Sequence, residues 1–129
     1  MTPDWLNDIV QAFGRQMGLQ DFRLRDNGAA GVTFENGLSL RLEYAGEALM
    51  MSMGLPVEVT DAAVRRLLTA AHPAAQQPAA ARVRAGLLKR TGEALLVIRL
   101  LERDVTVTVL EAAFRQLWTA ADRLRRTAS

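Results

Sequence analysis

Residues 36–53 read NGLSLRLEYAGEALMMSM, and this stretch decides the fold. Its opening Asn-Gly is a strong signal for a two-residue hairpin turn. Apolar and polar residues then alternate with a period of two, which predicts a strand with one buried face. After a second turn at Ala45 and Gly46, residues 48–53 are apolar on both faces. Such a strand lies either at the centre of a sheet or beneath a partner, and periodicity does not decide between these alternatives. The alternating apolar positions are Leu38, Leu40, Leu42 and Tyr44.

An amphipathic helix is predicted before this hairpin. Thr2 can cap it, Pro3 suits the first helical position, and Gly18 is a natural stop. Further strand signals follow at 22–25 and, with a clear alternation, at 30–34. The helix carries an apolar stripe with Trp5 at its edge, made of Leu6, Ile9, Val10, Phe13 and Met17.

A second helix is predicted over residues 60–71, and the proline-containing stretch 72–81 is predicted to be a surface loop. Strand signals return at 82–90 and 94–101. The last helix is predicted to begin between Thr106 and Thr108. Thr108 with Glu111 matches a capping box, and an earlier cap at Thr106 is equally compatible. The predicted order is α-β-β-β-α-β-β-α, an α+β fold in one domain spanning 1–129 with a disordered tail at 127–129.

The composition is that of an ordinary globular protein, with 50% hydrophobic and 23% charged residues. The chain has no cysteine, which excludes disulfides and thiolate metal sites. Asp4 and Asp8 stand where a secretory signal would carry positive charge, and no stretch is long and apolar enough for a membrane span. A net charge of +2 attracts nucleic acid only weakly.

Residues suited to chemistry are sparse. His72 is the only histidine, so neither a triad nor a histidine metal site can form. The carboxylates are scattered beside turns and on polar strand faces, and the glycines occur singly rather than in a phosphate-binding loop. We therefore expect the chain to have no catalytic, cofactor or metal site and expect that it is not an enzyme.

Two features point instead to binding. Met50, Met51 and Met53 could adapt to varied apolar partners, or could simply fill a central strand. The basic run at 122–126, together with Arg82, Arg84, Lys89 and Arg90, could contact phosphates, although arginines also suit the negative end of a helix.

The order of these elements resembles the class I type III secretion chaperones of Gram-negative bacteria. The resemblance covers nearly the whole chain and is made of degenerate apolar patterns. This chain departs from the family in not being acidic. The pieces that carry it are FGRQMGL at 13–19, RDNG at 25–28 followed by VTFE at 32–35, LSLRLE at 38–43, the Leu-rich second helix at 64–71, and AADRLR at 120–125.

The resemblance implies one twisted antiparallel sheet packed by helices, in a homodimer of the bacterial cytoplasm that uses the second helix and the next strand as its interface. That helix could equally pack on its own sheet. The implied function is to hold the extended N-terminal segment of an effector, which the export ATPase would release. The expected interface residues are Ala63, Leu67, Leu68, Ala71, Val83 and Leu87, and the expected effector-binding residues are Trp5, Ile9, Phe13, Val32, Phe34, Leu40 and Met50.

Two other functions stay open at this point. A regulatory protein could sequester its partner on the same scaffold. A nucleic-acid-binding module is the less favoured alternative, because the chain has few aromatic residues to stack on bases.

Overall fold

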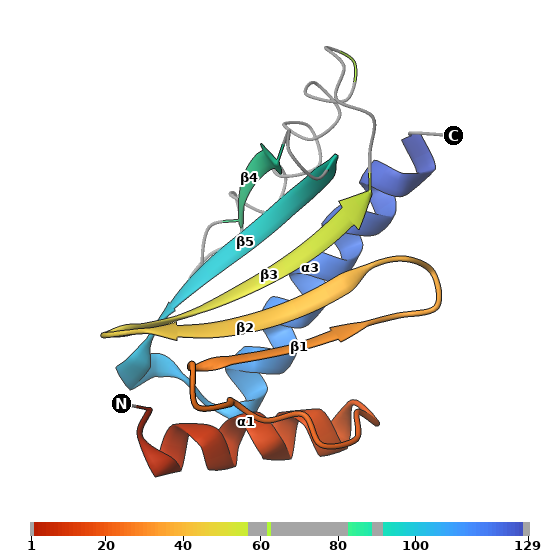
Figure 1. Cartoon of the computed structure of the whole chain (residues 1–129). Helices are drawn as coiled ribbons and strands as arrows, with labels where there is room; N and C mark the ends of the chain where they lie inside the picture. Colours follow the sequence, from red (N-terminus) through yellow and green to blue (C-terminus); the bar gives the residue numbers. More distant parts are fainter. Residues whose placement is uncertain (1, 57–61, 63–82, 89–91, 128–129) are drawn as a thin grey trace.

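The structure, a computed structural model, describes residues 2–56, 62, 83–88 and 92–127. In this part of the chain one five-stranded sheet is packed by two helices (Figure 1). This confirms the predicted α+β class. The elements are α1 (Asp4–Gln16), β1 (Ala29–Thr33), β2 (Ser39–Ala45), β3 (Ala48–Pro56), β4 (Val83–Leu88), β5 (Glu93–Leu101), the short 3₁₀ helix η2 (Glu102–Asp104) and α3 (Val107–Thr127).

The strands lie in the order β1-β2-β3-β5-β4, and every neighbouring pair is antiparallel. Strand β3 is therefore central, as its two apolar faces allowed. Met51 lies opposite Leu42 on β2 and Ile98 on β5, so these side chains share one face. We call this the inner face.

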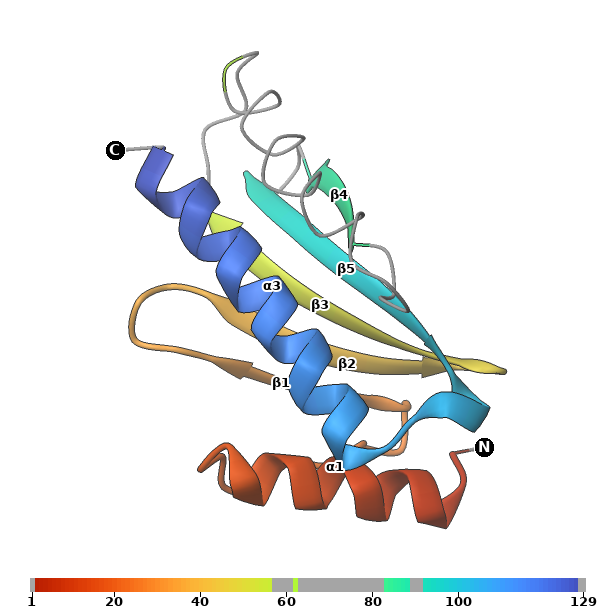
Figure 2. The ribbon, with the colours of Figure 1, turned by 180° about the vertical axis from the view of Figure 1, so that it is seen from behind.

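Helix α3 lies on the inner face, and α1 lies along the β1 edge of the sheet (Figure 2). Helix α3 crosses the sheet and contacts β3 and β5, and α1 packs against α3 below the β1 edge. The opposite, outer face carries polar residues at positions where the inner face is apolar, for example Arg41 and Ser52. The largest fully buried side chains of the sheet are Leu40, Leu42, Leu49, Met51, Met53, Leu96 and Ile98.

The helix ends partly correct the sequence-based expectations. Thr2 does not cap α1, because Pro3 occupies the N-cap position without a side-chain hydrogen bond. Gly18 does end that helix, with a φ of 75°. At α3 the Thr106 hydroxyl accepts a hydrogen bond from the Val109 N–H (3.1 Å), so Thr106 is the cap and the alternative at Thr108 is wrong.

Residues 22–25 run in an extended path beside α1 rather than as a strand. The Asn7 side chain takes the place of a strand partner here, because its Oδ1 accepts the Leu24 N–H at 3.0 Å and its Nδ2 donates to the Leu24 carbonyl. The predicted helix at 60–71 and the loop at 72–81 lie outside the described residues, apart from Ala62. Helix α3 continues to Thr127, the first residue of the predicted tail. No described helix is long and apolar enough to cross a membrane.

Candidate functional site

An apolar cavity of about 340 Å³ opens between the end of α1, the end of β1 and the middle of α3. We call it the aromatic pocket. Met17 is partly exposed at its rim, and Phe34 and Trp118 are half-buried. Arg115 and Thr119 add polar groups at the opening. Its lining residues are Met17, Phe34, Phe114, Arg115, Trp118 and Thr119.

The walls of the aromatic pocket hold one another in place. The Phe114 ring stacks on Trp118 with a centroid distance of 5.6 Å. Phe34 meets Trp118 edge to face at 5.5 Å and Phe114 at 6.3 Å. Aromatic pairs at such distances stabilise beyond their buried area, so the pocket is largely preformed.

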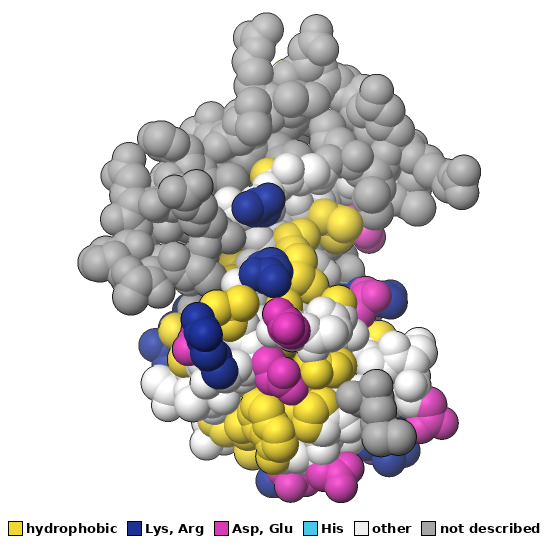
Figure 3. All heavy atoms as spheres, turned by 90° about the vertical axis from the view of Figure 1, so that its left-hand side faces the viewer, with side chains coloured by type: hydrophobic (Ala, Val, Ile, Leu, Met, Phe, Trp, Pro, Cys, Tyr) yellow, Lys and Arg dark blue, Asp and Glu magenta, His cyan; other side chains and the backbone are white. Residues whose placement is uncertain are grey.

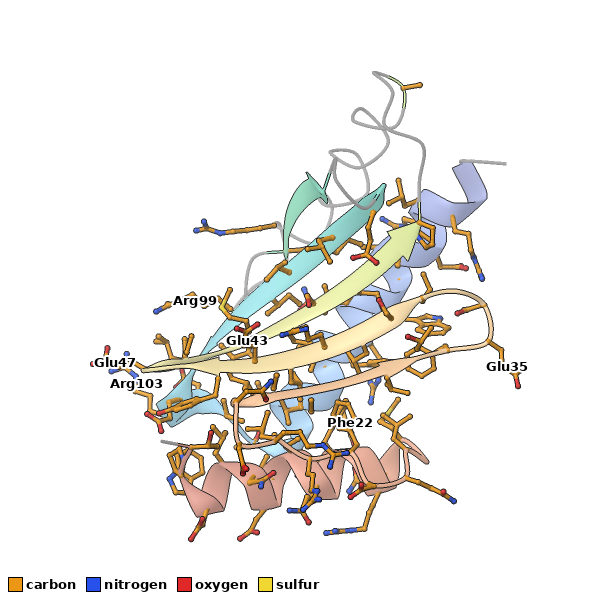
Figure 4. All side chains as sticks on the ribbon, viewed as in Figure 1. Phe22, Glu35, Glu43, Glu47, Arg99 and Arg103 are labelled. Carbon is orange, nitrogen blue, oxygen red and sulfur yellow. The ribbon has the colours of Figure 1, made fainter. Side chains whose placement is uncertain are left out.

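A second hollow of about 490 Å³ lies on the outer face beside β1, and we call it the β1-edge groove. Its floor is made of small side chains, and its wall is the segment 21–25. Figure 4 labels Phe22, which comes from this wall between α1 and β1. The outer-face floor consists of Ala29, Gly31, Thr33, Ser39, Ser52 and Gly54, with Arg41, Glu93 and Leu95 at its sides.

The backbone of β1 leaves an open edge along this groove. The Phe34 N–H donates to Leu38 and the Tyr44 N–H donates to Gly28, both at 2.8 Å. Bonding alternates along an antiparallel pair, so Gly31 and Thr33 direct their N–H and C=O groups away from β2. Within the described part of the chain, neither residue has a backbone partner on that side. An extended polypeptide could satisfy these groups.

The charges of the β1-edge groove are mainly those of arginines. Arg23 and Arg25 both pair with Asp21, each at 3.2 Å. Arg41 lies 3.4 Å from Glu43, which Figure 4 labels on the same face of the sheet. All of these pairs are largely exposed, so they contribute little to folding and remain accessible to a ligand.

The structure distributes the predicted effector-binding residues over several places. Phe34 lines the aromatic pocket, and Val32 and Leu40 line the β1-edge groove. Trp5 is 46% exposed near the start of α1, at the opposite end of that helix from the aromatic pocket. Met50 is half-buried on the outer face between Glu43 and Arg99. Apolar side chains also gather in the lower half of Figure 3, the half in which α1 lies, among acidic and basic groups.

Three of the predicted residues belong mainly to the core. Phe13 is fully buried, Leu40 is 1% exposed, and Ile9 is packed against the same cluster. Phe13 has a connecting role, because its ring lies 6.1 Å from Phe22 of the groove wall and 6.2 Å from Phe114 of the aromatic pocket.

Most of the expected interface residues lie outside the part of the chain that the structure describes. Ala63, Leu67, Leu68 and Ala71 lie outside the described residues, as does the side chain of Leu87. Val83 is described, and it is 6% exposed within the core of the single chain.

Sequence reasoning missed Trp118, Phe114 and Met17 as site residues. They belong to helical apolar stripes, which normally face a core. The available signal was their size, since a helix that carries both Phe114 and Trp118 on neighbouring turns presents more aromatic surface than one small sheet covers.

The described residues include no group of three or more His, Asp or Glu that could hold a metal ion. Burial, followed by its hydrogen bond to Glu102, raises the pKa of Tyr44. The Tyr44 hydroxyl donates to Glu102 Oε1 at 3.0 Å, which fastens β2 to η2. This arrangement stabilises structure and provides no acid or base near either hollow.

A family model described as type III secretory system chaperone SycN matches residues 5–124. Among solved structures, the ExsC–ExsE complex covers 96% of this chain and 93% of its own, with a TM-score of 0.77 at 20% identity. The Yersinia pestis type III secretion chaperone SycH, in complex with a fragment of YscM2, covers 96% and 99%, with a TM-score of 0.68 at 19% identity.

The same fold also occurs in YbjN, a putative transcription regulator from E. coli, with a TM-score of 0.55 at 13% identity and coverage of 91% and 86%. At these identities the solved structures establish the fold alone. The match to the family model, which spans residues 5–124, shows the family of the chain. No curated protein matches the sequence.

Proposed function

Because the chain belongs to the family of the type III secretory system chaperone SycN, we propose that it binds the extended N-terminal segment of an effector as a homodimer and keeps that segment competent for secretion. The chain is a type III secretion chaperone by family. The partner segment, its extended state and the dimer are the proposed parts.

One observation carries this proposal: a preformed aromatic pocket and an open strand edge border the same strand. Phe34, directly after β1, lines the aromatic pocket, while Gly31 and Thr33 present the free edge. An extended segment can use both, by seating an apolar side chain in the pocket and pairing its backbone with β1.

Energetics favours such a divided site. Ordering a flexible chain costs about 1–2 kcal/mol per residue. Hydrogen bonds to an edge return only about 0.5–1.5 kcal/mol each. Burying one large apolar side chain contributes about 1.5–3 kcal/mol, so the pocket supports the ordering that the edge requires.

The homodimer is supported by the family and by the sequence of the helix predicted over residues 60–71. That helix carries Leu67 and Leu68 among alanines, a surface suited to close packing against a copy of itself. Light scattering at micromolar concentration should give twice the chain mass, and Leu68→Arg should lower it to one chain. A wild-type protein with the mass of one chain would remove the dimer from the proposal.

The main test is recovery of the partner. The tagged chain, expressed in its own host, should co-purify with an effector whose N-terminal region resists protease in the complex and not alone. A Trp118→Ala chain purified in parallel should lose the partner, whereas Trp5→Ala should retain it. Recovery of a regulator in place of an effector would assign the chain to the regulatory class on the same scaffold.

Nucleic-acid binding is the remaining alternative. It predicts a steep loss of oligonucleotide affinity with rising salt. Of the bases that sequence reasoning assigned to such a surface beside the C-terminal run, only Arg84 is described.

A further inference from the structure

We propose that the partner strand that pairs with β1 is acidic at every second residue, on the side facing the β1-edge groove, and that Arg23, Arg25 and Arg41 select those carboxylates. This inference rests on the proposed function, because it assumes that an extended segment adds at β1.

The wall of the β1-edge groove and the strand β1 that contributes to its floor both show the alternation of a strand. In the segment 21–25, Phe22 and Leu24 are buried while Arg23 and Arg25 are exposed. In β1 the buried or half-buried positions alternate with outward ones in the same way. A strand placed against this edge therefore has one apolar side and one side that meets the arginines.

Small side chains make the arginines reachable from the edge. Arg41 lies directly opposite Gly31 in the β1–β2 register, on the outer face. Since Gly31 has no side chain, nothing on β1 stands between the Arg41 side chain and a strand added beside it. A carboxylate on that strand would meet the guanidinium of Arg41 across one small residue.

The charges near the edge are unequal in sign. Three arginines, Arg23, Arg25 and Arg41, face two carboxylates at this end. Asp21 contacts both Arg23 and Arg25, and Glu43 lies 3.4 Å from Arg41. A third carboxylate belongs to Glu93. It lies over Gly54, with its Cδ 3.0 Å from the position that a Cβ on Gly54 would take, and therefore over β3 rather than at the edge.

Guanidinium groups prefer carboxylates as paired ligands, and like charges placed opposite one another are unfavourable. A basic partner strand would bring its cations against the arginines, and a neutral one would leave them without a new ligand. An acidic alternation is therefore the chemistry that fits this end of the groove.

The test uses a displayed library of random peptides about ten residues long, the upper range of a strand. Selection against the full-length chain should enrich sequences with Asp or Glu at every second position. The same selection against Arg23→Gln/Arg25→Gln/Arg41→Gln should retain enrichment and lose the acidic bias. For one enriched peptide, Arg41→Gln alone should weaken binding about two- to fivefold, and the effect should shrink at high salt.

Asp21→Asn is the matched control, because it should change the affinity for the acidic peptide in the opposite direction. It removes the carboxylate that Arg23 and Arg25 share, at a left-handed position (φ 52°) that Asn tolerates well. This variant should bind the same acidic peptide about two- to fivefold more tightly.

Gly31→Pro separates the two proposals. It removes the outward N–H of β1 and leaves the ladder to β2 intact, since Ala30 and Val32 make that ladder. It should abolish enrichment, whereas Gly31→Ala, which keeps the N–H, should not. If the wild-type chain enriches peptides without an acidic bias and Gly31→Pro abolishes that enrichment, the charge selection is overturned and strand addition at β1 is retained. Enrichment that survives Gly31→Pro, or no enrichment at all, overturns strand addition at β1 and the charge selection with it.

Discussion

The aromatic pocket and the β1-edge groove border the same strand and differ in chemistry. The pocket lies on the helix-covered side and is walled by Phe34, Phe114 and Trp118. The groove lies on the open side, with small residues as its floor and arginines beside them. Apolar burial is non-directional and strong, whereas backbone pairing is directional and weak in net free energy. The pocket is thus suited to supply affinity, and the groove to supply register and selection.

Phe13 connects the two regions, and its loss should have the largest effect. Its ring contacts both Phe22 and Phe114, so Phe13→Ala removes support from both hollows at once. We expect a loss of about 3–5 kcal/mol in the free energy of unfolding, measured by chemical denaturation. Phe13→Leu, which keeps most of the apolar volume, should lose less than half as much. A small effect of Phe13→Ala would mean that the two hollows are supported independently.

Trp118→Ala should distinguish the two regions, because it removes a wall of the aromatic pocket and leaves the β1-edge groove unchanged. We expect partner binding to weaken by about 2–4 kcal/mol, the range of a central aromatic contact, with a smaller change in stability. Isothermal titration with the recovered partner measures this change. Trp5→Ala is the control, because Trp5 is an equally large side chain, 46% exposed away from the pocket. Equal losses for both variants would move the anchoring site from the pocket to the whole of α1.

Gly14→Ala should disturb the groove wall rather than the pocket. A Cβ at Gly14 would lie 2.7 Å from the Phe22 Cβ, so the segment 21–25 must move away from α1. Overpacking costs about 1–3 kcal/mol, against a gain of about 1 kcal/mol for alanine in a helix. The melting temperature should therefore fall modestly. Gly86→Ala, where a Cβ meets open space, should leave it unchanged or slightly higher. A higher melting temperature for Gly14→Ala would show that the segment 21–25 moves away from α1 without a cost in stability.

Tyr44→Phe should have the smallest effect and should leave both hollows intact. The folded-state pKa of Tyr44 is raised, so its contribution to stability is present below the pKa of an unfolded tyrosine. That contribution is lost as the pH rises through the folded-state pKa. The wild-type chain should therefore destabilise above about pH 10, and Tyr44→Phe should lack this part of the pH dependence. Because Tyr44 is the only tyrosine, tyrosinate absorbance follows it directly. If tyrosinate absorbance gives Tyr44 an ordinary pKa, the hydrogen bond from Tyr44 to Glu102 does not contribute to stability.

The hairpins could be predicted well from the sequence because their signals are local. Asn36 and Gly37 carry the turn chemistry, and Gly37 takes the positive φ of 90° that favours glycine. The cap of α3 was predicted only as one of two alternatives, since Thr106 and Thr108 differ by less than a turn and either hydroxyl can serve. The cap of α1 was predicted wrongly, because Thr2 lies one residue too early to reach an orphan N–H.

The candidate site could be predicted only in part. Phe34, Val32 and Leu40 do line hollows, but Leu40 is 1% exposed and Phe13 is fully buried, since periodicity identifies a face and not a depth. Trp118 was not singled out from the sequence. It forms a pocket wall because its half-buried ring packs against Phe34, directly after β1, and against Phe114 of the same helix.

The sequence by itself determined the two long helices and the five strands that the structure describes. Turn residues, alternation and helical stripes act over a few residues, and each remains readable without the rest of the fold. The tertiary structure decided which apolar and charged side chains stay accessible. That outcome depends on strand order, on the crossing of α1 and α3, and on which edge of β1 finds a partner. These are contacts between residues far apart in the chain, and no local pattern encodes them.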